Sequence, residues 1–363
     1  LHTTVTVPAF LEGKELIFHV LGTDSRGQNS ATQVVGYVEG SPRWTEIVSR
    51  GSQLLDYDDQ RVLYQGADGS TYLANRAGGG EVLLRGPIPF LSPYGRIGSG
   101  WLHPQGALFT SSGLYDLRNG TVQALSGYAT GVAGNWLILR DGGTNGGTAG
   151  SLFRRDLALG TMQLVGRAND QHVAANGDVV YSSEDWDILR YRGGVTTRLT
   201  PVSDLRNAYP VTDGINVVFL RTPIFINTNG AQIILITPTG AEVVLAPSNF
   251  LQTPMVPGQD YAVNGGWTAF TRVVNNSVKQ VWVRSPSSVL YQITDGTATR
   301  LVRSLGPNGE LVYSGTTGRM YLVLPPYTAA PVDVGAWYPG TVFEWRNGQL
   351  VAFLGRSAFT ISY

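Results

Sequence analysis

The chain has 363 residues, of which 42% are hydrophobic and 14% are charged, and its 26 basic side chains balance its 26 acidic ones. Zero net charge provides no long-range attraction to nucleic acid or to anionic membranes, and the absence of cysteine excludes disulfides, thiolate metal sites and a cysteine nucleophile. The 46 glycines and the few charged residues favour short strands joined by tight turns over exposed helices.

One short sequence motif, called the phrase below, recurs along the chain. In it a Gly-containing turn and a spacer residue precede three or four apolar residues. Looser copies lie near Gly13, Gln60, Gly106 and Gly134, and clear copies contain Gly177, Gly214, Gly265, Gly309 and Gly348. Asn-Gly and Asp-Gly tolerate the positive φ of a two-residue hairpin turn, so each copy predicts a turn that leads into a buried strand. The nine copies recur about every 40 residues, which is typical of propeller blades.

The unit around Gly177 contains the whole predicted blade. His172–Ala175 is predicted as its inner strand, Val179–Ser182 as the second, Asp187–Tyr191 as the third and Val195–Thr200 as the outer strand. Comparable outer strands are predicted in four other repeats, at residues 81–84, 121–125, 161–165 and 242–245. Each blade is therefore expected to be a four-stranded antiparallel sheet.

The two ends of the chain complement each other. The last repeat supplies only three strands, the third of them Phe359–Ser362, while Thr3–Val7 alternates like an outer strand. Pairing these segments would cover two sheet edges that would otherwise be bare. The sequence thus predicts one all-β propeller domain over residues 1–363, with nine blades and a ring closed by the N-terminal strand. Eight blades is the alternative, because only 28 residues separate Gly106 from Gly134.

The run from Val180 to Tyr191, with Arg198-Leu199-Thr200 after it, resembles a TolB-type β-propeller repeat. Such repeats pair an apolar strand that ends in a small polar residue with an acidic turn, an Ile-Tyr-type strand and a closing Leu-Thr. TolB itself has an additional N-terminal domain, for which this chain has no room. Because these repeats occur in binding modules, peptidase gating domains and polysaccharide lyases, the resemblance implies a fold and not a reaction.

The sequence contains few candidates for catalysis or metal binding. Of its four histidines we single out His172, which is expected near the mouth of the central channel, although a structural role is the ordinary alternative. No acid–base pair is visible, so no catalytic residue is assigned and a non-enzymatic role is preferred. Acidic residues cluster at 56–59 and 184–187, but neither cluster has the full ligand series of a calcium loop. We expect no cofactor or metal, with calcium as the alternative.

Ligand binding is predicted on one face of the ring. Loops from outer to inner strands and from second to third strands share a face, and the longest of them are residues 85–96, 141–150, 222–229 and 247–260. Aromatic faces near polar groups suit a sugar or a peptide, while packing of the loops on their own aromatics is the alternative. The predicted ligand-binding residues are Phe90, Tyr94, Arg96, Glu184, Asp185, Asp187, Phe250 and Asp260.

These observations favour a non-catalytic binding platform that recognises a protein or a glycan on its loop-rich face. It is expected to be exported, in a secreted, cell-surface or periplasmic location, with no nucleic-acid partner and no membrane span. A carbohydrate-active enzyme, either a polysaccharide lyase or a glycoside hydrolase with its site at the channel mouth, is the alternative. A propeller that forms part of a larger surface protein is a third hypothesis.

Overall fold

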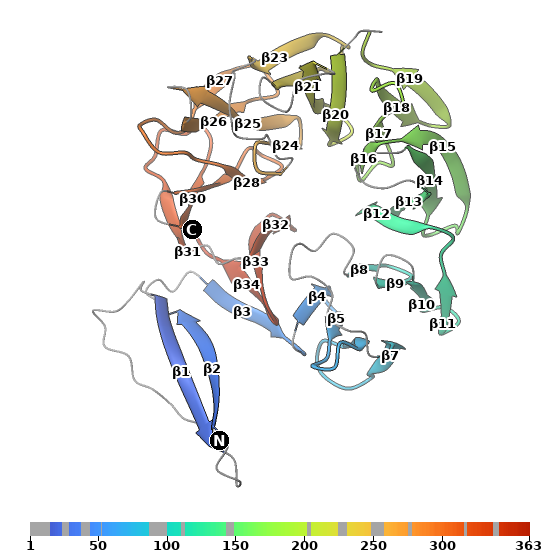
Figure 1. Ribbon diagram of the computed structural model, residues 1–363, viewed down its shortest axis with the longest axis vertical. Coiled ribbons are helices and arrows are strands. Elements are labelled where there is room, and N and C mark those ends of the chain that lie inside the picture. Colours follow the sequence, from blue (N-terminus) through green and yellow to red (C-terminus); the bar gives the residue numbers. More distant parts are fainter. Residues whose placement is uncertain are drawn as a thin grey trace.

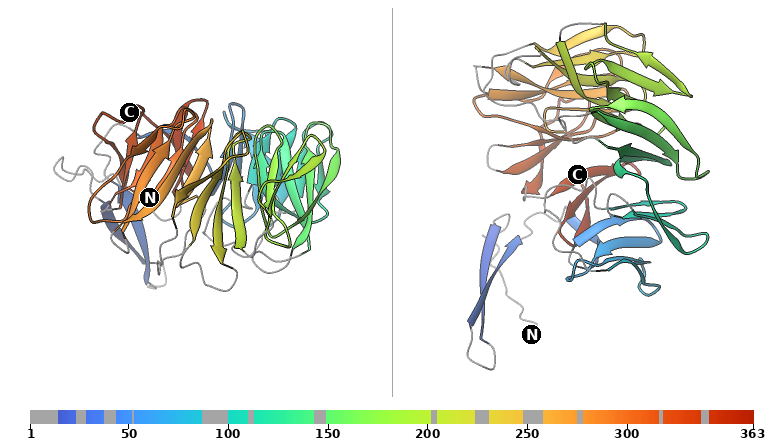
Figure 2. Two further views of the ribbon diagram at one scale, coloured as in Figure 1. Left: turned by 90° about the horizontal axis from the view of Figure 1, so that it is seen from above. Right: turned by 45° about the vertical axis from the view of Figure 1, so that its right-hand side comes forward.

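The computed structural model describes residues 15–23, 29–37, 44–51, 53–86, 100–109, 113–142, 149–201, 205–223, 231–247, 258–274, 278–315, 318–336 and 341–363, with side chains from residue 44 onward. All regular elements in these ranges are strands, and apart from one two-stranded hairpin they form eight four-stranded antiparallel sheets arranged as a ring (Figure 1). Seen from the side, the ring is a thick disc (Figure 2). The predicted all-β propeller is therefore confirmed.

The strands of seven blades follow one another directly along the chain, and those of the eighth come from both ends. The first four blades are β4–β7 (Gln53–Tyr57, Arg61–Gln65, Thr71–Asn75, Val82–Arg85), β8–β11 (Gly100–His103, Gly106–Phe109, Gly113–Asp116, Thr121–Ala124), β12–β15 (Tyr128–Ala133, Trp136–Asp141, Gly150–Asp156, Met162–Ala168) and β16–β19 (Asp170–Val173, Val179–Ser182, Ile188–Arg192, Val195–Arg198). The others are β20–β23 (Leu205–Thr212, Val217–Pro223, Gln232–Ile236, Glu242–Ala246), β24–β27 (Tyr261–Asn264, Trp267–Val274, Val278–Arg284, Leu290–Gln292), β28–β31 (Val302–Leu305, Leu311–Ser314, Arg319–Val323, Val332–Ala336) and the closing blade β32–β33–β34–β3 (Val342–Arg346, Gln349–Leu354, Ser357–Ile361, Trp44–Ser49). The four strands predicted around Gly177 match β16–β19 to within two residues at each end.

An N-terminal strand closes the ring, as predicted, but a different segment provides it. Strand β34 pairs with β33 on one side and with β3 on the other, where Trp44 lies opposite Ile361 and Glu46 opposite Phe359. Both edges of β34 are thus occupied, so the prediction that Thr3–Val7 pairs with Phe359–Ser362 is wrong. Thr3–Val7 itself lies outside the described residues.

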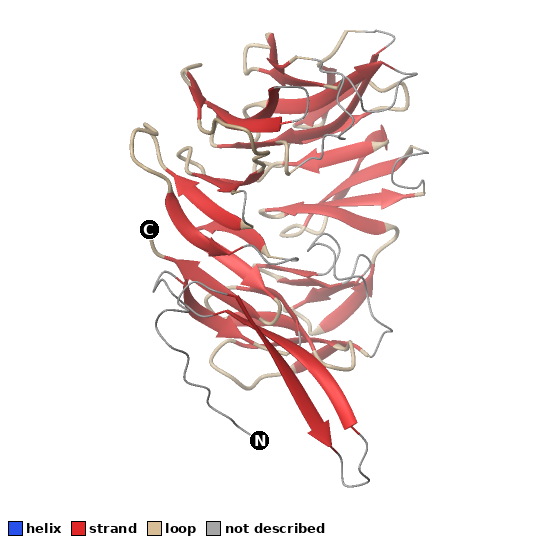
Figure 3. Ribbon diagram, turned by 60° about the vertical axis from the view of Figure 1, so that its left-hand side comes forward, coloured by secondary structure: helices blue, strands red, loops and turns tan. Residues whose placement is uncertain are grey.

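The count of nine blades is also wrong, because the copy of the phrase at Gly13 does not begin a blade. It precedes β1 (Glu15–Thr23), which pairs only with β2 (Asn29–Tyr37) in a two-stranded hairpin beside the ring (Figures 1 and 3). The short interval between Gly106 and Gly134 is real: it reflects the compact blade β8–β11, whose strands have four residues each.

The hydrophobic core is divided among the blade junctions. Each of the eight clusters of buried side chains joins two successive blades, and the cluster of Val48, Leu54 and Phe353 joins the closing blade to the first. Second strands have both faces covered in this arrangement, which explains why the phrase continues as an unbroken apolar run. Each of the eight second strands contains at least one fully buried residue, and these include Leu63, Leu108, Ile138, Val180, Phe219, Phe270, Val312 and Ala352.

The glycine of the phrase lies where neighbouring blades touch. Gly177 has a φ of +85°, and a Cβ atom there would lie 2.5 Å from the Trp136 ring of the preceding blade. Gly309 repeats this arrangement, with a φ of +91° and the Trp267 ring 2.7 Å from a Cβ position. The Gly177 carbonyl also accepts a hydrogen bond from Nη1 of Arg154 in the preceding blade, at 2.6 Å. The phrase therefore encodes both a hairpin turn and a contact between blades.

The antiparallel order gives the disc two distinct faces. Connections from second to third strands, and from fourth strands to the next blade, leave on what we call the loop face. The turns between first and second strands and between third and fourth strands lie on the opposite side, which we call the turn face. The described part of the chain holds no helix with the length and hydropathy needed to cross a bilayer.

Candidate functional site

The predicted binding loops begin and end at the loop face. The strands that flank residues 85–96, 184–187 and 249–260 belong to different blades, and their connected ends all lie at this face. Phe90, Tyr94, Arg96 and Phe250 lie outside the described residues, so their proposed binding role stays a prediction. The connection between β17 and β18 is described in full, and its surroundings form the candidate site.

Trp186 occupies an unusual backbone position in this connection. The segment forms a tight turn in which Ser183 N donates to Asp187 O at 2.9 Å and Trp186 N donates to Ser183 O at 3.1 Å. The Asp187 N–H in turn donates to the Ser183 hydroxyl at 3.2 Å. Trp186 has a φ of +62°, in the left-handed region that bulky residues rarely adopt. Such a conformation costs on the order of 1–3 kcal/mol and persists only where surrounding contacts fix it.

Those contacts come from the first strand of the next blade. The Trp186 carbonyl accepts hydrogen bonds from both the backbone N and the Nδ2 of Asn207, at 3.1 and 3.0 Å. Asn207 is buried, and its Oδ1 accepts a hydrogen bond from Nε of Arg221 at 2.9 Å. Arg221 is held in turn by an ion pair with Glu242. The turn is therefore anchored to the sheet of the neighbouring blade.

This anchoring places the Trp186 ring against Arg206. The guanidinium carbon of Arg206 lies 3.5 Å from the ring centroid, a close cation–π contact. Arg206 makes no side-chain hydrogen bond or ion pair with any other described residue. Its N–H donors are thus held in one orientation by stacking while remaining available, and a guanidinium fork of this kind matches a carboxylate.

A second aromatic residue, Tyr209, lies on β20, the strand that also carries Arg206. The pairing of β20 with β21 shifts register between Ala208 and Val211, and Tyr209 within this bulge has a φ of +54°. Its side chain is 36% exposed although β20 is an innermost strand. The hydroxyl of Tyr261, from the following blade, donates to the Tyr209 carbonyl at 2.6 Å and supports the bulge. Bulges of this kind redirect a side chain away from the regular sheet surface.

Asp170 lies at the start of β16, beside both features. Burial raises the pKa of its carboxyl group, although the Tyr209 backbone N–H, the Ser182 hydroxyl and the charges of Arg206 and Arg140 oppose the shift. In the folded protein the group therefore binds a proton more readily than in the unfolded chain. Its contribution to stability falls as pH rises from the ordinary carboxyl pKa through the raised one.

We expect the substitution Asp170→Asn to raise the melting temperature at pH 7 and to leave it unchanged near pH 3. Asparagine keeps an oxygen that can accept the Ser182 hydroxyl at 3.3 Å, but it has no charge to desolvate. The matched control is Asp185→Asn, because Asp185 is exposed and no described residue pairs with it. Melting curves at both pH values measure the effect, and equal shifts for the two variants would contradict this account.

The structure brings only some of the predicted ligand-binding residues into the candidate site. Glu184 and Asp185 are exposed on the turn that carries Trp186, and Glu184 pairs with Arg167 at 2.9 Å. Asp187 is buried and points toward the outer strand, where Arg198 binds it at 2.6 Å. Asp260 is buried and ion-paired with Lys279, so its carboxylate is already neutralised. Both of these last two acids have structural partners.

His172 lies toward the turn face and not near the mouth on the loop side. It is the third residue of β16, and its Nδ1 accepts a hydrogen bond from the Thr212 backbone N–H at 3.3 Å. The side chain is accessible from the channel, but protein surrounds it, and this loss of bulk solvation lowers its pKa. The imidazole is therefore held neutral with Nδ1 as the acceptor. Among the described side chains, no group of three or more potential metal ligands comes together.

Comparison with known proteins assigns the chain to no family. No family model matches the chain, and no curated protein does. Similar solved structures include BamB from Moraxella catarrhalis, with 12% identity and a TM-score of 0.49 over 88% of this chain and 99% of that one. TolB from Acinetobacter baumannii has 11% identity and a TM-score of 0.36 over 82% and 78%. The dipeptidyl peptidase 4 of Porphyromonas gingivalis has 12% identity and a TM-score of 0.49, and the chain covers 56% of its length.

Proposed function

We propose that this propeller is a non-catalytic binding module that recognises a protein or a glycan through its loop face. The observation that carries the proposal is the Arg206 guanidinium, stacked on Trp186 at 3.5 Å with its N–H donors unused among the described residues. A ligand carboxylate there would gain a charge-assisted hydrogen bond without the entropy cost of ordering a free arginine side chain. Tyr209 would supply apolar contact beside it.

Two further features support recognition over a purely structural role. Trp186 and Tyr209 are non-glycine residues with positive φ, and they lie on adjacent blades. Strained backbone of this kind gathers where a protein positions groups for a ligand. The TolB-type assignment, the exported location and the contribution of Tyr94, Arg96, Phe90 and Phe250 belong to the same proposal.

The substitution Arg206→Gln should weaken binding of a carboxylate-bearing ligand by at least about 2 kcal/mol, or roughly thirtyfold, because it removes the charged fork. The measurement is binding to arrays of glycans and peptides, followed by titration of the strongest ligand. Arg284→Gln is the matched control, because Arg284 ends β26 at the turn face. Trp186→Ala should give an intermediate loss, since the charge remains but its orientation is freed.

The proposal fails if Arg206→Gln binds as the parent protein does while Arg284→Gln loses affinity. Catalysis is tested separately with neutral and anionic polysaccharides. New unsaturated-sugar absorbance would indicate a lyase, and new reducing ends would indicate a hydrolase. Either signal, if abolished by His172→Ala or Tyr94→Phe, would replace the binding module with the carbohydrate-active enzyme.

A further inference from the structure

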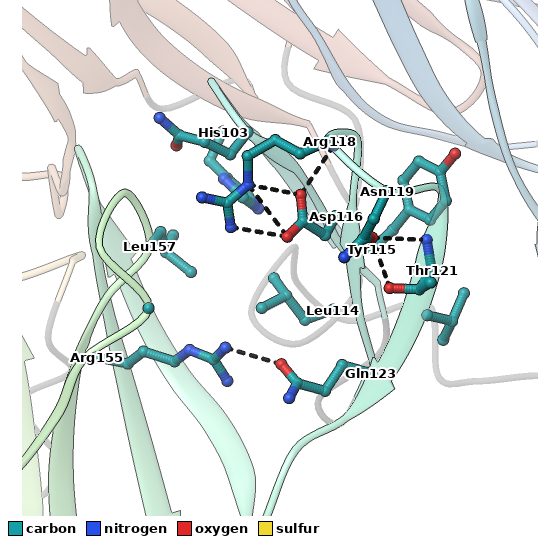
Figure 4. Close-up of a pocket in the computed structure, with 13 residues that line it drawn as sticks. His103, Leu114, Tyr115, Asp116, Arg118, Asn119, Thr121, Gln123, Arg155 and Leu157 are labelled. Carbon is teal, nitrogen blue, oxygen red and sulfur yellow. Dashed lines mark hydrogen bonds and ion pairs between the residues drawn. The ribbon is translucent and has the colours of Figure 1, made fainter.

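The turn face carries a pocket that the site on the loop face does not use. It lies between the blades β8–β11 and β12–β15 and has a volume of about 330 Å³ (Figure 4). The buried side chains of Leu114 and Leu157 contribute its apolar part. Polar side chains from the two turns and from β11 complete the wall, so the pocket is the size of a small molecule with both apolar and polar groups.

The two guanidinium groups in the pocket differ in their partners. Arg118 is neutralised, because its Nε and Nη2 both bind the Asp116 carboxylate, Nη2 at 2.7 Å. Arg155 has no carboxylate partner among the described residues, and its one side-chain hydrogen bond runs from Nη2 to the Gln123 amide oxygen at 2.8 Å (Figure 4). Burial lowers the pKa of Arg155, which means that its surroundings disfavour the charge. The Asp116 carboxylate also favours the charge of Arg155, so two guanidinium groups share one carboxylate and the pocket keeps one excess positive charge.

The same wall of the pocket contains several buried polar atoms whose hydrogen bonds are incomplete. The Nε of Arg155 is buried without a hydrogen-bond partner in the described structure. The His103 ring nitrogens and the Oε1 of Gln105 are also buried and meet no partner at strict hydrogen-bond geometry, although Gln105 lies close enough to favour the protonated form of His103. His103 is only 5% exposed, and burial outweighs the Gln105 contact and lowers its pKa to about 4, so the ring is neutral at physiological pH. Buried polar atoms without full partners are few in native proteins, and their presence around one pocket supports a bound molecule that completes them.

We propose that this pocket binds a small organic monocarboxylate with a compact apolar body. The carboxylate would bind the Arg155 guanidinium, where Nη1 carries N–H groups that no described residue uses, and the apolar body would lie against Leu114 and Leu157. A carboxylate balances the one uncompensated charge, whereas a cation would add to it and a neutral sugar would leave it unbalanced. The flexible amide groups of Gln105 and Gln123 are positioned to accept or donate to a substituent on the ligand.

The test is titration of the full chain with benzoate and 4-hydroxybenzoate, and with their neutral amides, by calorimetry and ligand-observed NMR. We expect saturable binding of the carboxylates and at least tenfold weaker binding of the amides. Arg155→Gln should weaken carboxylate binding roughly tenfold to a hundredfold, because it removes a charge-assisted contact. Arg155→Lys keeps the charge but not the planar fork and should lie between. Arg356→Gln, an exposed position in the β33–β34 turn, is the control and should bind as the parent does.

Melting curves and circular dichroism establish that each variant is folded before its affinity is compared. Equal affinity for acids and amides, unchanged affinity in a folded Arg155→Gln variant, or failure of both carboxylates to saturate would each overturn the proposal. Because the pocket lies on the face opposite Arg206, loss of binding here leaves the loop-face function untouched, and the reverse also holds.

Discussion

A chain that lacks residues 1–50 should melt at a clearly lower temperature than the complete chain, whereas a chain that lacks only residues 1–43 should melt as the complete one does. The first truncation removes β3 and with it the five paired positions along β34. It also removes the buried Val48 side chain and the contacts of the Trp44 ring with Phe343 and Phe359. Cross-strand pairs and buried side chains of this kind together contribute on the order of 5 kcal/mol. At roughly 1–2 °C per kcal/mol for a chain of this length, the melting temperature should fall by roughly 5–10 °C.

The truncations also distinguish strand pairing from other effects of shortening the chain. An unpaired β34 edge should promote association, so the shorter chain is expected to elute earlier and more broadly on a sizing column. A peptide with the sequence of residues 43–50, added in trans, should restore part of the lost stability by occupying that edge. If removal of residues 1–43 destabilises the protein as much as removal of 1–50, the closure by β3 is not what holds the ring together.

The substitution Lys279→Met should destabilise the protein by about 3–5 kcal/mol, because it removes the ion pair that Lys279 makes with the buried Asp260 carboxylate. Lys279 is 3% exposed and Asp260 is 1% exposed, and Nζ donates to the two carboxylate oxygens at 2.8 and 2.9 Å. The Thr271 hydroxyl also donates to Asp260, at 2.7 Å, so the whole group lies inside the blade β24–β27. The free energy of unfolding, measured with urea, reports the loss.

Two companion variants test whether the lost ion pair is the cause of the destabilisation. Arg319→Met breaks the more exposed pair with Asp333 and should cost no more than about 1 kcal/mol. Combining Lys279→Met with Asp260→Leu removes both buried charges and should recover most of the loss. If the double variant is as unstable as the single one, packing around the lysine stem is the source of stability and not its charge.

The fold was largely predictable from the sequence because its dominant signals are local. A Gly-containing turn followed by an apolar run specifies the first hairpin of each blade, and the spacing of the copies specifies repetition. The copy at Gly13 was miscounted because a turn and a strand carry no information about which sheet the strand joins. The closing strand was misassigned for a similar reason: Trp44 is recognised as part of the last blade only through its pairing with Ile361, near the other end of the chain.

The site was harder to predict because its defining contacts cross between repeats. The acidic turn drew attention to residues 184–187, but the partner of Trp186 is Arg206 on the next blade. The left-handed backbone of Trp186 has no signature in the sequence, since a tryptophan is not expected there. For Asp260 a usable signal did exist. The chain has only two lysines, and one of them lies within the apolar strand Val278–Arg284, where an unpaired charge would be costly.

That buried ion pair also determines how the protein can be attached to other molecules. Of the two lysines, Lys279 is enclosed and charged, so amine-reactive reagents have little access to a neutral amine there. Side-chain coupling should therefore be directed to Lys14, which directly precedes β1 in the sequence. Because neither face of the disc has another lysine, such chemistry would leave the described side chains of both faces unmodified. The wild-type chain is thus suited to oriented immobilisation without an engineered tag.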